Sequence, residues 1–272
     1  MSQQSNVLPD GTQVMTPYLC AKDAAAAIAF YQQAFGAVET SRMTDGGKVA
    51  HAELAINGVS IFLSDEYPEI DVLSPQSLGG SPVALHLMVP DVDAVVERTV
   101  AAGAQLLRPV ADQFHGHRNG KLKDPFGHVW MIATPLNPKP TQPAESMRTG
   151  FHTVTPYLLA QDVDALVDFV KHAFNAVETL RTRGSAGGFH IEVRIGDSMV
   201  MIGGGGNWSG AAIPAMIHLY VPDVDAVYQR ARAAGGSSVM EPADQPDGDR
   251  RGGVQDQLGN VWYIATPQPN IA

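Results

Sequence analysis

The chain has 272 residues, of which 44% are apolar and 17% are charged, and its formal net charge is −10. This apolar fraction excludes an intrinsically disordered chain, and the length predicts about two ordinary domains, each with a packed core. Because an acidic chain repels phosphate backbones and anionic lipid, we expect neither nucleic acid nor a membrane as a partner.

Helix-like and strand-like patterns alternate along the first half of the chain. Apolar residues at helical spacing in 24–35, followed by Gly36, predict a helix with a glycine cap. Residues 92–102, ended by Gly103, predict a second helix. A helix between strands that are followed by hairpins favours an α+β fold over a doubly wound parallel sheet. The strand-like runs are 14–20, 49–56, 59–64, 83–89 and 128–133.

The second half of the chain repeats the first. Thr16–Leu19 recurs as Thr155–Leu158, an offset of 139 residues, whereas Val89–Val95 recurs as Val221–Val227, an offset of 132. The second copy has therefore lost seven residues around the loop-like stretch 71–82. We predict a flexible N-terminal segment (1–13), a first domain (14–135), a proline-rich linker (136–150) and a second domain (151–272).

Strand alternation separates polar from apolar side chains. In the strand predicted at 49–56, the aliphatic residues share one face, and His51 and Glu53 share the other. In the strand predicted at 83–89, His86 and Met88 lie opposite the aliphatic face. The aliphatic faces suit the two helices, so the opposite faces must look into water or into a cavity.

Four segments of the first copy carry a family resemblance: Asp23–Tyr31, His51–Leu54, Asp91–Ala94 and Asp124–Trp130. They resemble the glyoxalase/bleomycin-resistance/extradiol-dioxygenase family, also called vicinal oxygen chelate (VOC) proteins. The resemblance covers nearly the whole chain, is closest to a subgroup labelled demethylubiquinone-methyltransferase-like, and implies a fold more than a reaction. The implied fold is a tandem glyoxalase-like repeat, in which each copy has two βαβββ modules forming cup-shaped mixed sheets, as in a fused pseudo-dimer.

Members of the family that use a metal hold a divalent ion on four inward positions, which the resemblance maps onto both copies. Only the glutamates at these positions suit such an ion, because Thr, Ala and Met offer no good ligand. We therefore expect the family's standard metal site to be absent. The mapped positions are about Thr16, Glu53, Ala84 and Met131 in the first copy and Thr155, Glu192, Met216 and Tyr263 in the second.

A substitute metal site is a separate hypothesis. Residues at i and i+2 on a strand are about 6.5 Å apart, so His51 and Glu53 could converge with His86 on Fe, Mn, Zn or Ni. Alternatively, these are polar sheet residues that are hydrogen-bonded to each other or to water, which is the interpretation we favour. The second copy repeats the set as His190, Glu192 and His218.

The remaining inward residues are mostly aromatic side chains and methionines, which are typical of a small-molecule pocket. Alternatively, they pack at the interface between the repeats. Because the first copy pairs methionines where the second has tyrosines, we expect the two sites to differ in affinity. The candidate ligand-binding residues are Tyr18, Met88, Met131, Tyr157, Tyr220 and Tyr263.

Other conspicuous residues are expected to be structural. Trp130 and Trp262 fall on the helix-facing side of their strands and should lie in the core. Cys20 is the only cysteine, which excludes an intrachain disulfide, and we expect it to be apolar packing. Arg118 and Arg250 recur at equivalent positions, where each could anchor a carboxylate of a ligand or pair with a nearby aspartate, Asp112 and Asp244 respectively; we favour the ion pair.

The leading functional hypothesis is a protein that binds a small hydrophobic or aromatic molecule in its cups, in the manner of the family's antibiotic-sequestering members. The alternative is a divalent-metal-dependent lyase, isomerase or dioxygenase, in which Glu53 or Glu192 moves a proton as the catalytic residue. We predict either a monomer that acts as a fused pseudo-dimer or a homodimer. The start of the chain lacks signal-peptide features, so a cytoplasmic location is expected.

Overall fold

The computed structural model describes residues 14–113, 116–136, 150–184 and 187–268. The chain divides into two compact units. The first unit comprises residues 18–158, and the second comprises residues 159–272 together with the residues before 18. The predicted N-terminal segment (1–13) and nearly all of the predicted linker (136–150) lie outside the described residues.

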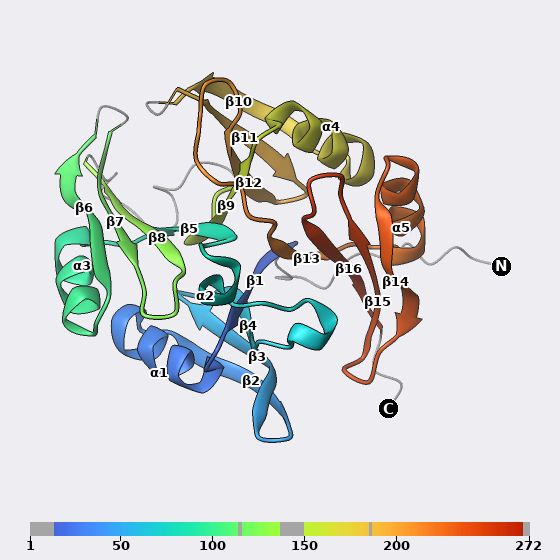
Figure 1. The fold of residues 1–272 in the computed structure, drawn as a ribbon, viewed down its shortest axis with the longest axis horizontal. Helices are drawn as coiled ribbons and strands as arrows, with labels where there is room; N and C mark the ends of the chain where they lie inside the picture. The colour runs from blue at the N-terminus through green and yellow to red at the C-terminus, as the bar shows by residue number, and fades with distance from the viewer. Residues whose placement is uncertain (1–13, 114–115, 137–149, 185–186, 269–272) are drawn as a thin grey trace. The chain divides into compact units, whose positions relative to one another are not determined.

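Within its described residues, the first unit runs through two successive modules, each made of a strand, a helix and three further strands (Figure 1). A short 3-10 helix (η1) and a one-turn helix (α2) connect them. The elements are β1 (Met15–Ala21, which enters this unit at Tyr18), α1 (Ala24–Phe35), β2 (Val38–Asp45), β3 (Lys48–Ile56), β4 (Val59–Asp65), η1 (Pro68–Ile70), α2 (Pro75–Leu78), β5 (Val83–Met88), α3 (Val92–Ala101), β6 (Gln105–Asp112), β7 (His117–Lys123) and β8 (Val129–Pro135).

The second unit has the same order of elements but lacks counterparts of η1 and α2 among its described residues. This difference falls where the sequence comparison places the loss of seven residues. The elements are β9 (Val154–Ala160, which enters this unit at Leu159), α4 (Val163–Phe174), β10 (Val177–Arg183), β11 (Phe189–Ile195), β12 (Ser198–Gly204), β13 (Met216–Tyr220), α5 (Val224–Ala233), β14 (Ser237–Asp244), β15 (Asp249–Gln255) and β16 (Val261–Pro267).

The sheets are mixed, as predicted. In the first unit β1 runs parallel to β4, and β5 runs parallel to β8, whereas the consecutive strands β2–β3–β4 and β6–β7–β8 pair antiparallel. In the second unit β13 runs parallel to β16, and β10–β11–β12 and β14–β15–β16 pair antiparallel. The predicted α+β class with tandem βαβββ modules is therefore confirmed.

Bulges interrupt the outer strands at equivalent places. In β6 the register shifts on both sides of Arg108, and in β14 it shifts on both sides of Met240, which is the residue equivalent to Arg108 at the offset of 132. A bulge adds a residue to one strand, bends it and increases its twist. The outer strand is therefore bent at the same position in both repeats.

Each long helix begins at an aspartate whose carboxylate accepts a hydrogen bond from a backbone N–H of the first turn. Asp23 accepts from the N–H of Ala26, and Asp162 accepts from that of Ala165. The predicted helix 24–35 is observed with these bounds, and Gly36 ends it in the left-handed conformation that glycine adopts without strain. The caps of α3 and α5 are Asp91 and Asp223.

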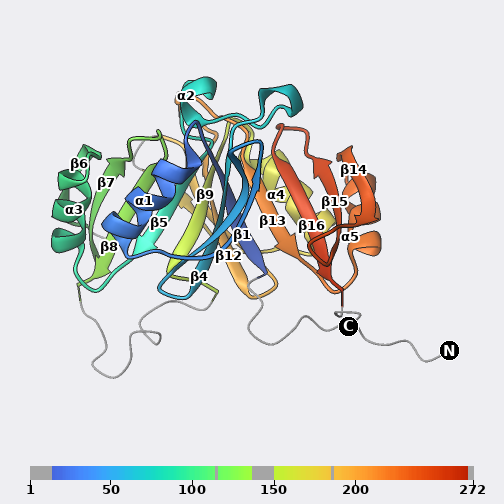
Figure 2. The same cartoon turned by 90° about the horizontal axis from the view of Figure 1, so that it is seen from below.

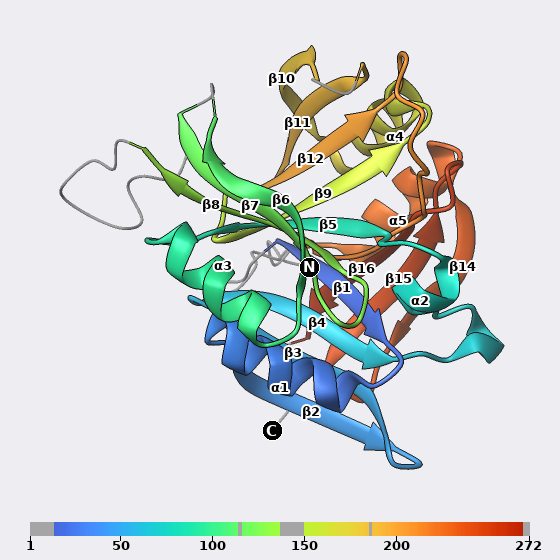
Figure 3. The same cartoon turned by 60° about the vertical axis from the view of Figure 1, so that its left-hand side comes forward.

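The helices cover one face of the strands. In the first unit α1 packs against β2–β4 and against α3, which in turn packs against β6–β8 (Figures 1 and 3). In the second unit α5 lies against β14–β16 (Figure 2) and packs on α4. The aliphatic residues of the strands, such as Leu54 and Leu85, face the helices and are fully buried. None of the helices in the described parts of the chain is long and apolar enough to span a membrane.

A buried aspartate organises the core of the first unit. The Asp124 carboxylate accepts hydrogen bonds from the Tyr31 hydroxyl (2.8 Å) and the Trp130 indole N–H (2.9 Å). Burial opposes ionisation of this group, but the adjacent His128 and these hydrogen bonds hold the pKa of Asp124 below its usual range. The second unit has an equivalent network, in which Asp256 accepts from the Trp262 indole N–H at 3.0 Å.

Candidate functional site

Three polar side chains from two strands of the first unit lie in a row, joined by one hydrogen bond and one longer ion-pair contact. The Tyr18 hydroxyl lies 2.8 Å from His51 Nδ1, and His51 Nε2 lies 3.6 Å from Glu53 Oε1. The rings of Tyr18 and His51 both pack edge-on against Phe62, with centroid separations of 5.8 and 5.0 Å. We call Tyr18, His51 and Glu53 the Tyr18 chain.

The pleat of the strands explains this arrangement. Phe62 in β4 is opposite Tyr18 in β1 and opposite Glu53 in β3, so these side chains share one sheet face. Ala52 and Leu54 alternate with His51 and Glu53, are fully buried, and face the helix side. The sequence therefore predicted correctly that His51 and Glu53 share a face. It did not predict the hydrogen bond to Tyr18, although Tyr18 was a candidate ligand-binding residue.

The second copy keeps the histidine–glutamate pair in a different environment. His190 Nε2 lies 3.4 Å from Glu192 Oε1, yet only 3% of the Glu192 side chain is exposed, compared with 38% of that of Glu53. Met201, rather than a phenylalanine, lies opposite Glu192 on the next strand. The repeated pair is therefore held in a more apolar, less accessible setting in the second copy.

Residues predicted to bind a ligand also gather on the face of β9, β5 and β8 in the first unit. His86 in β5 lies opposite Met131 in β8 and Thr155 in β9, and Tyr157 lies opposite Ala84. All but Thr155 and Ala84 are half-buried, as is Met88 on the same face. The structure therefore brings His86, Met88, Met131 and Tyr157 onto one sheet face.

Two basic residues extend this face, and the sequence analysis missed both. Lys121 in β7 lies opposite Met131, and Arg108 in β6 lies opposite Lys121. Arg108 Nη2 donates to Asn119 Oδ1 at 2.8 Å. We call the line of residues Arg108, Lys121, Met131, His86 and Thr155 the Lys121 row.

A signal for the basic residues exists in the sequence, but it is weak. In β7 the residues Asn119 and Lys121 alternate with Gly120 and Leu122, which is strand periodicity. The strand was not predicted because its polar positions outnumber its apolar ones.

The equivalent row in the second unit has different chemistry. His218 in β13 lies opposite Tyr263 in β16, and Tyr263 lies opposite Gly253 in β15. A Cβ atom on Gly253 would lie 3.3 Å from the Tyr263 ring, so the glycine leaves room for the tyrosine. Burial raises the pKa of the Tyr263 hydroxyl. We call Met240, Gly253, Tyr263 and His218 the Gly253 row.

Beside the Gly253 row, the guanidinium of Arg251 is paired with two carboxylates. Arg251 Nη2 donates to Asp247 Oδ2 at 2.6 Å and to Asp249 Oδ2 at 3.1 Å. The Tyr220 hydroxyl donates to the same Asp249 oxygen at 3.1 Å, and the Tyr220 ring packs against His218 at 4.6 Å. The structure thus brings Tyr220, Tyr263 and His218 together near an arginine that is paired with two aspartates.

Residues 12–132 and 150–264 each match the Glyoxalase/Bleomycin resistance protein/Dioxygenase superfamily. The chain belongs to this superfamily. The match covers both copies, so the tandem repeat of the VOC domain is confirmed. The finer resemblance to the demethylubiquinone-methyltransferase-like subgroup stays a prediction.

Two relatives match different lengths of this chain, one about the length of a single repeat and the other nearly the whole chain. An uncharacterized protein of Mycobacterium bovis is 44% identical over 126 residues, which are 45% of this chain and 83% of that protein. A protein of the same organism, provisionally named a glyoxylase, is 27% identical over 259 residues, covering 91% and 92% of the two chains. Glyoxalase I from Zea mays superposes with a TM-score of 0.69 at 13% identity, covering 94% and 92%, which establishes similarity of fold alone.

The structure does not assemble the predicted metal sets. Within the described ranges, no group of three or more His, Cys, Asp or Glu side chains could hold a metal ion. His51 and Glu53 lie on β3, which pairs with β2 and β4, whereas His86 lies on β5, which pairs with β8 and β9. The ligand role of these residues, and of His190, Glu192 and His218, stays a prediction.

The residues expected to be structural are so. Trp130 and Trp262 are fully buried. Arg118 pairs with Asp112 at 3.0 Å, and Arg250 pairs with Asp244 at 3.1 Å, as predicted. Each arginine also makes two hydrogen bonds to a helix aspartate that was not predicted, Asp93 or Asp225 respectively.

Cys20 is unsuited to nucleophilic catalysis. Burial, with smaller contributions from Glu66 and Asp65, raises the pKa of the Cys20 thiol to about 12. A nucleophilic cysteine reacts as the thiolate, which is scarce at neutral pH with such a pKa. This agrees with the predicted role in packing.

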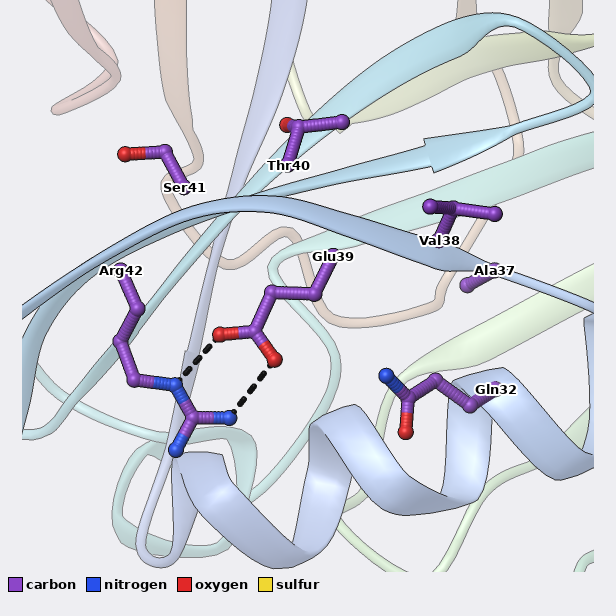
Figure 4. A pocket seen from close by; sticks show the side chains of 7 residues that line it. All are labelled: Gln32, Ala37, Val38, Glu39, Thr40, Ser41 and Arg42. Atoms are coloured by element: carbon purple, nitrogen blue, oxygen red, sulfur yellow. Dashed lines mark hydrogen bonds and ion pairs between the residues drawn. The ribbon is translucent and has the colours of Figure 1, made fainter.

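A shallow hollow lies on the outer side of the first unit, between the end of α1 and β2 (Figure 4). Its charged groups compensate each other, because Glu39 and Arg42 point toward one another and form a two-hydrogen-bond ion pair (Figure 4). Glu178 and Arg181 repeat this pair in the second unit. None of the predicted site residues lines the hollow, so we treat it as a surface feature.

Proposed function

We propose that this superfamily protein binds a small, partly aromatic molecule on the open faces of its sheets, and that affinity alone is its function. The observation that carries the proposal is the Tyr18 chain packed against Phe62. A row of polar side chains beside an aromatic ring suits a ligand with a flat apolar body and one polar group. The superfamily's bleomycin-resistance members are the precedent for this type of function.

The second face supports the same type of ligand. Met88, Met131 and Tyr157 are half-buried on one sheet face of the first unit, and methionine adapts its shape to varied ligands. In the second unit, Tyr220 and Tyr263 provide aromatic contacts in place of the methionines. The difference supports the prediction that the repeats differ in affinity.

A divalent metal, which the superfamily implies, does not fit the donor atoms present. At the positions that the resemblance maps to metal ligands, Ala84 has no donor atom, and Met131 offers only a thioether. His51 and Glu53 supply two donors, but no third His, Cys, Asp or Glu of the described residues completes a group with them. We therefore derive no catalytic step through a metal.

The alternative is the metal-dependent lyase, isomerase or dioxygenase, in which Glu53 or Glu192 is catalytic. Elemental analysis of protein purified without chelator separates the two functions. Stoichiometric metal that disappears in His86→Ala and His218→Ala would contradict the binding proposal. Metal-free protein that binds aromatic compounds would support it.

Calorimetric titration of the full chain with 2-naphthamide, a neutral aromatic amide, tests the proposed function. We expect saturable binding, weakened about fivefold by His51→Ala, because this variant removes the centre of the Tyr18 chain. His172→Ala is the matched control, since His172 is exposed on α4 and its Nδ1 bonds to the backbone carbonyl of Asp168 in the same helix. Absence of saturable binding of 2-naphthamide, 2-naphthol, 2-naphthoate and 2-naphthyl phosphate would refute the proposal.

A further inference from the structure

The Lys121 row contains an uncompensated positive charge in a chain that is strongly acidic overall. Lys121 is half-buried, and no carboxylate of the described residues lies within ion-pair distance of its ammonium. Removing an ammonium from water without a partner is costly. Because the chain has a net charge of −10, acidic residues are abundant, and their scarcity does not explain why this lysine lacks an ion-pair partner.

A second cation increases this cost. Arg108 lies opposite Lys121 in the β6–β7 ladder, on the same sheet face, so the two side chains are direct cross-strand neighbours. Like charges in that position destabilise a sheet. Arg108 Nη2 donates a hydrogen bond to the amide oxygen of Asn119. Because this partner is neutral, the contact does not compensate the positive charge of the guanidinium.

The titration behaviour agrees with this geometry. Burial lowers the pKa of the Lys121 ammonium, and the positive charge of Arg108 lowers it further. An anion placed between the two side chains would offset both effects by attracting the ammonium charge. A bound anion would therefore relieve a cost that the free protein carries.

The neighbours of the two cations indicate what else the ligand carries. Met131 lies opposite Lys121, and Met88 and Tyr157 lie on the same face nearer β9. These side chains offer apolar and aromatic contact, whereas Arg108 is exposed at the outer strand. The face is therefore basic toward β6 and apolar toward β9.

We propose that the face of β5–β8 in the first unit binds a small aromatic carboxylate, with its anionic group between Lys121 and Arg108 and its ring against Met131 and Met88. Asn119 is a positioning residue that orients Arg108. This inference rests on the proposed function and names the class of ligand for one of its faces. The equivalent face in the second unit is excluded, because Gly253 and Met240 replace the two cations.

The test compares three naphthalene compounds by calorimetric titration of the full chain. These are 2-naphthoate, its neutral isostere 2-naphthamide, and 2-naphthyl phosphate. We expect 2-naphthoate to bind about tenfold more tightly than 2-naphthamide, as a charge-assisted contact to a half-buried lysine predicts. Lys121→Met should abolish this preference, and Lys121→Arg should retain most of it.

Lys22→Met is the matched control, because it removes the same charge from an exposed position just before α1. It should leave the preference for 2-naphthoate unchanged. Near-ultraviolet circular dichroism of the buried tryptophans establishes that each variant is folded. Loss of the preference in Lys121→Met alone supports the assignment.

The possible failures are distinct. Equal affinity for 2-naphthoate and 2-naphthamide would overturn the carboxylate assignment and leave the proposed function standing. Tighter binding of 2-naphthyl phosphate than of 2-naphthoate, dependent on Lys121, would overturn the carboxylate class in favour of a phosphate ester. If none of the three compounds binds, the proposed function fails and this inference fails with it.

Discussion

The Lys121 row of the first unit and the Gly253 row of the second are built on the same backbone and treat charge in opposite ways. Both have a histidine on the central strand, His86 or His218. In the first row Lys121 lies beside Arg108, and no carboxylate of the described residues pairs with the lysine. Beside the second row, Arg251 is held between Asp247 and Asp249. The comparison teaches that the fold fixes which positions share a face, and that ligand preference is decided by a few exchanges on it.

The largest expected effect concerns the buried cores of the two units. It tests whether the units differ only on these sheet faces or also in their cores. Asp124→Ala leaves the buried Trp130 indole N–H without its acceptor. It also removes one of the two partners of the buried Tyr31 hydroxyl, which keeps His128 Nδ1 at 3.0 Å, so the free energy of unfolding should fall by about 3 kcal/mol. Asp256→Ala should cost a similar amount. Urea denaturation measures both, with Asp168→Ala on the exposed side of α4 as the control. A cost below about 1 kcal/mol for either would show that the cores also differ.

A transplant should move the anion preference from one unit to the other. Gly253→Lys and Met240→Arg place both cations of the Lys121 row at the equivalent positions of the second unit. Tyr263→Met makes room for the lysine, since a Cβ at position 253 approaches that ring to 3.3 Å. In a Lys121→Met background, the triple variant should regain about a tenfold preference for 2-naphthoate over 2-naphthamide in calorimetric titration. A folded triple variant without this preference would show that the row alone does not decide the ligand.

Releasing Arg251 should have a smaller effect in the same direction. Asp247→Asn with Asp249→Asn removes both carboxylates that hold the guanidinium, so the second face should gain about threefold in affinity for 2-naphthoate. Asp244→Asn is the control, because Asp244 pairs with Arg250 in an outer ion pair. Equal gains in the two variants would indicate a general charge effect rather than release of Arg251.

The smallest effect concerns acid stability of the first unit. His128 and hydrogen bonds from Trp130 and Tyr31 hold the pKa of Asp124 below its unfolded-state value of about 3.9, although burial opposes this. A depressed carboxyl pKa stabilises the fold above the unfolded-state pKa, and this stabilisation is lost as the pH falls through the folded-state pKa. The stability difference between the natural chain and Asp124→Asn should therefore shrink below about pH 4. Urea midpoints from pH 7 to pH 3 measure it, and a constant difference would contradict this account.

Much of the fold could be predicted from the sequence because its signals are local. Aspartate caps and the closing Gly36 mark helix α1 at both ends, and the two offsets reveal the repeat and its shortened loop. Strands β2 and β6 were missed because their residues are almost entirely exposed, which removes the apolar alternation that identifies a strand.

The candidate site was predictable only in part. The face shared by His51 and Glu53 follows from alternation within one strand. Which strands are adjacent is a property of the sheet, so the grouping of His86 with these two residues could not be tested by spacing. Lys121 was missed for a related reason, because its role depends on Arg108 across the β6–β7 ladder and neither strand was predicted.

The bulge at Arg108 has a counterpart at Met240 in the second repeat, and it affects how the sequences of such proteins can evolve. A residue flanked by register shifts contributes little to the regular ladder, so its replacement disturbs few backbone hydrogen bonds. The same position holds a guanidinium in one repeat and a thioether in the other, on strands that are otherwise equivalent. Selection can therefore retune the charge at this edge of the binding face at little cost to folding, and a duplicated fold can acquire two ligand preferences from one architecture.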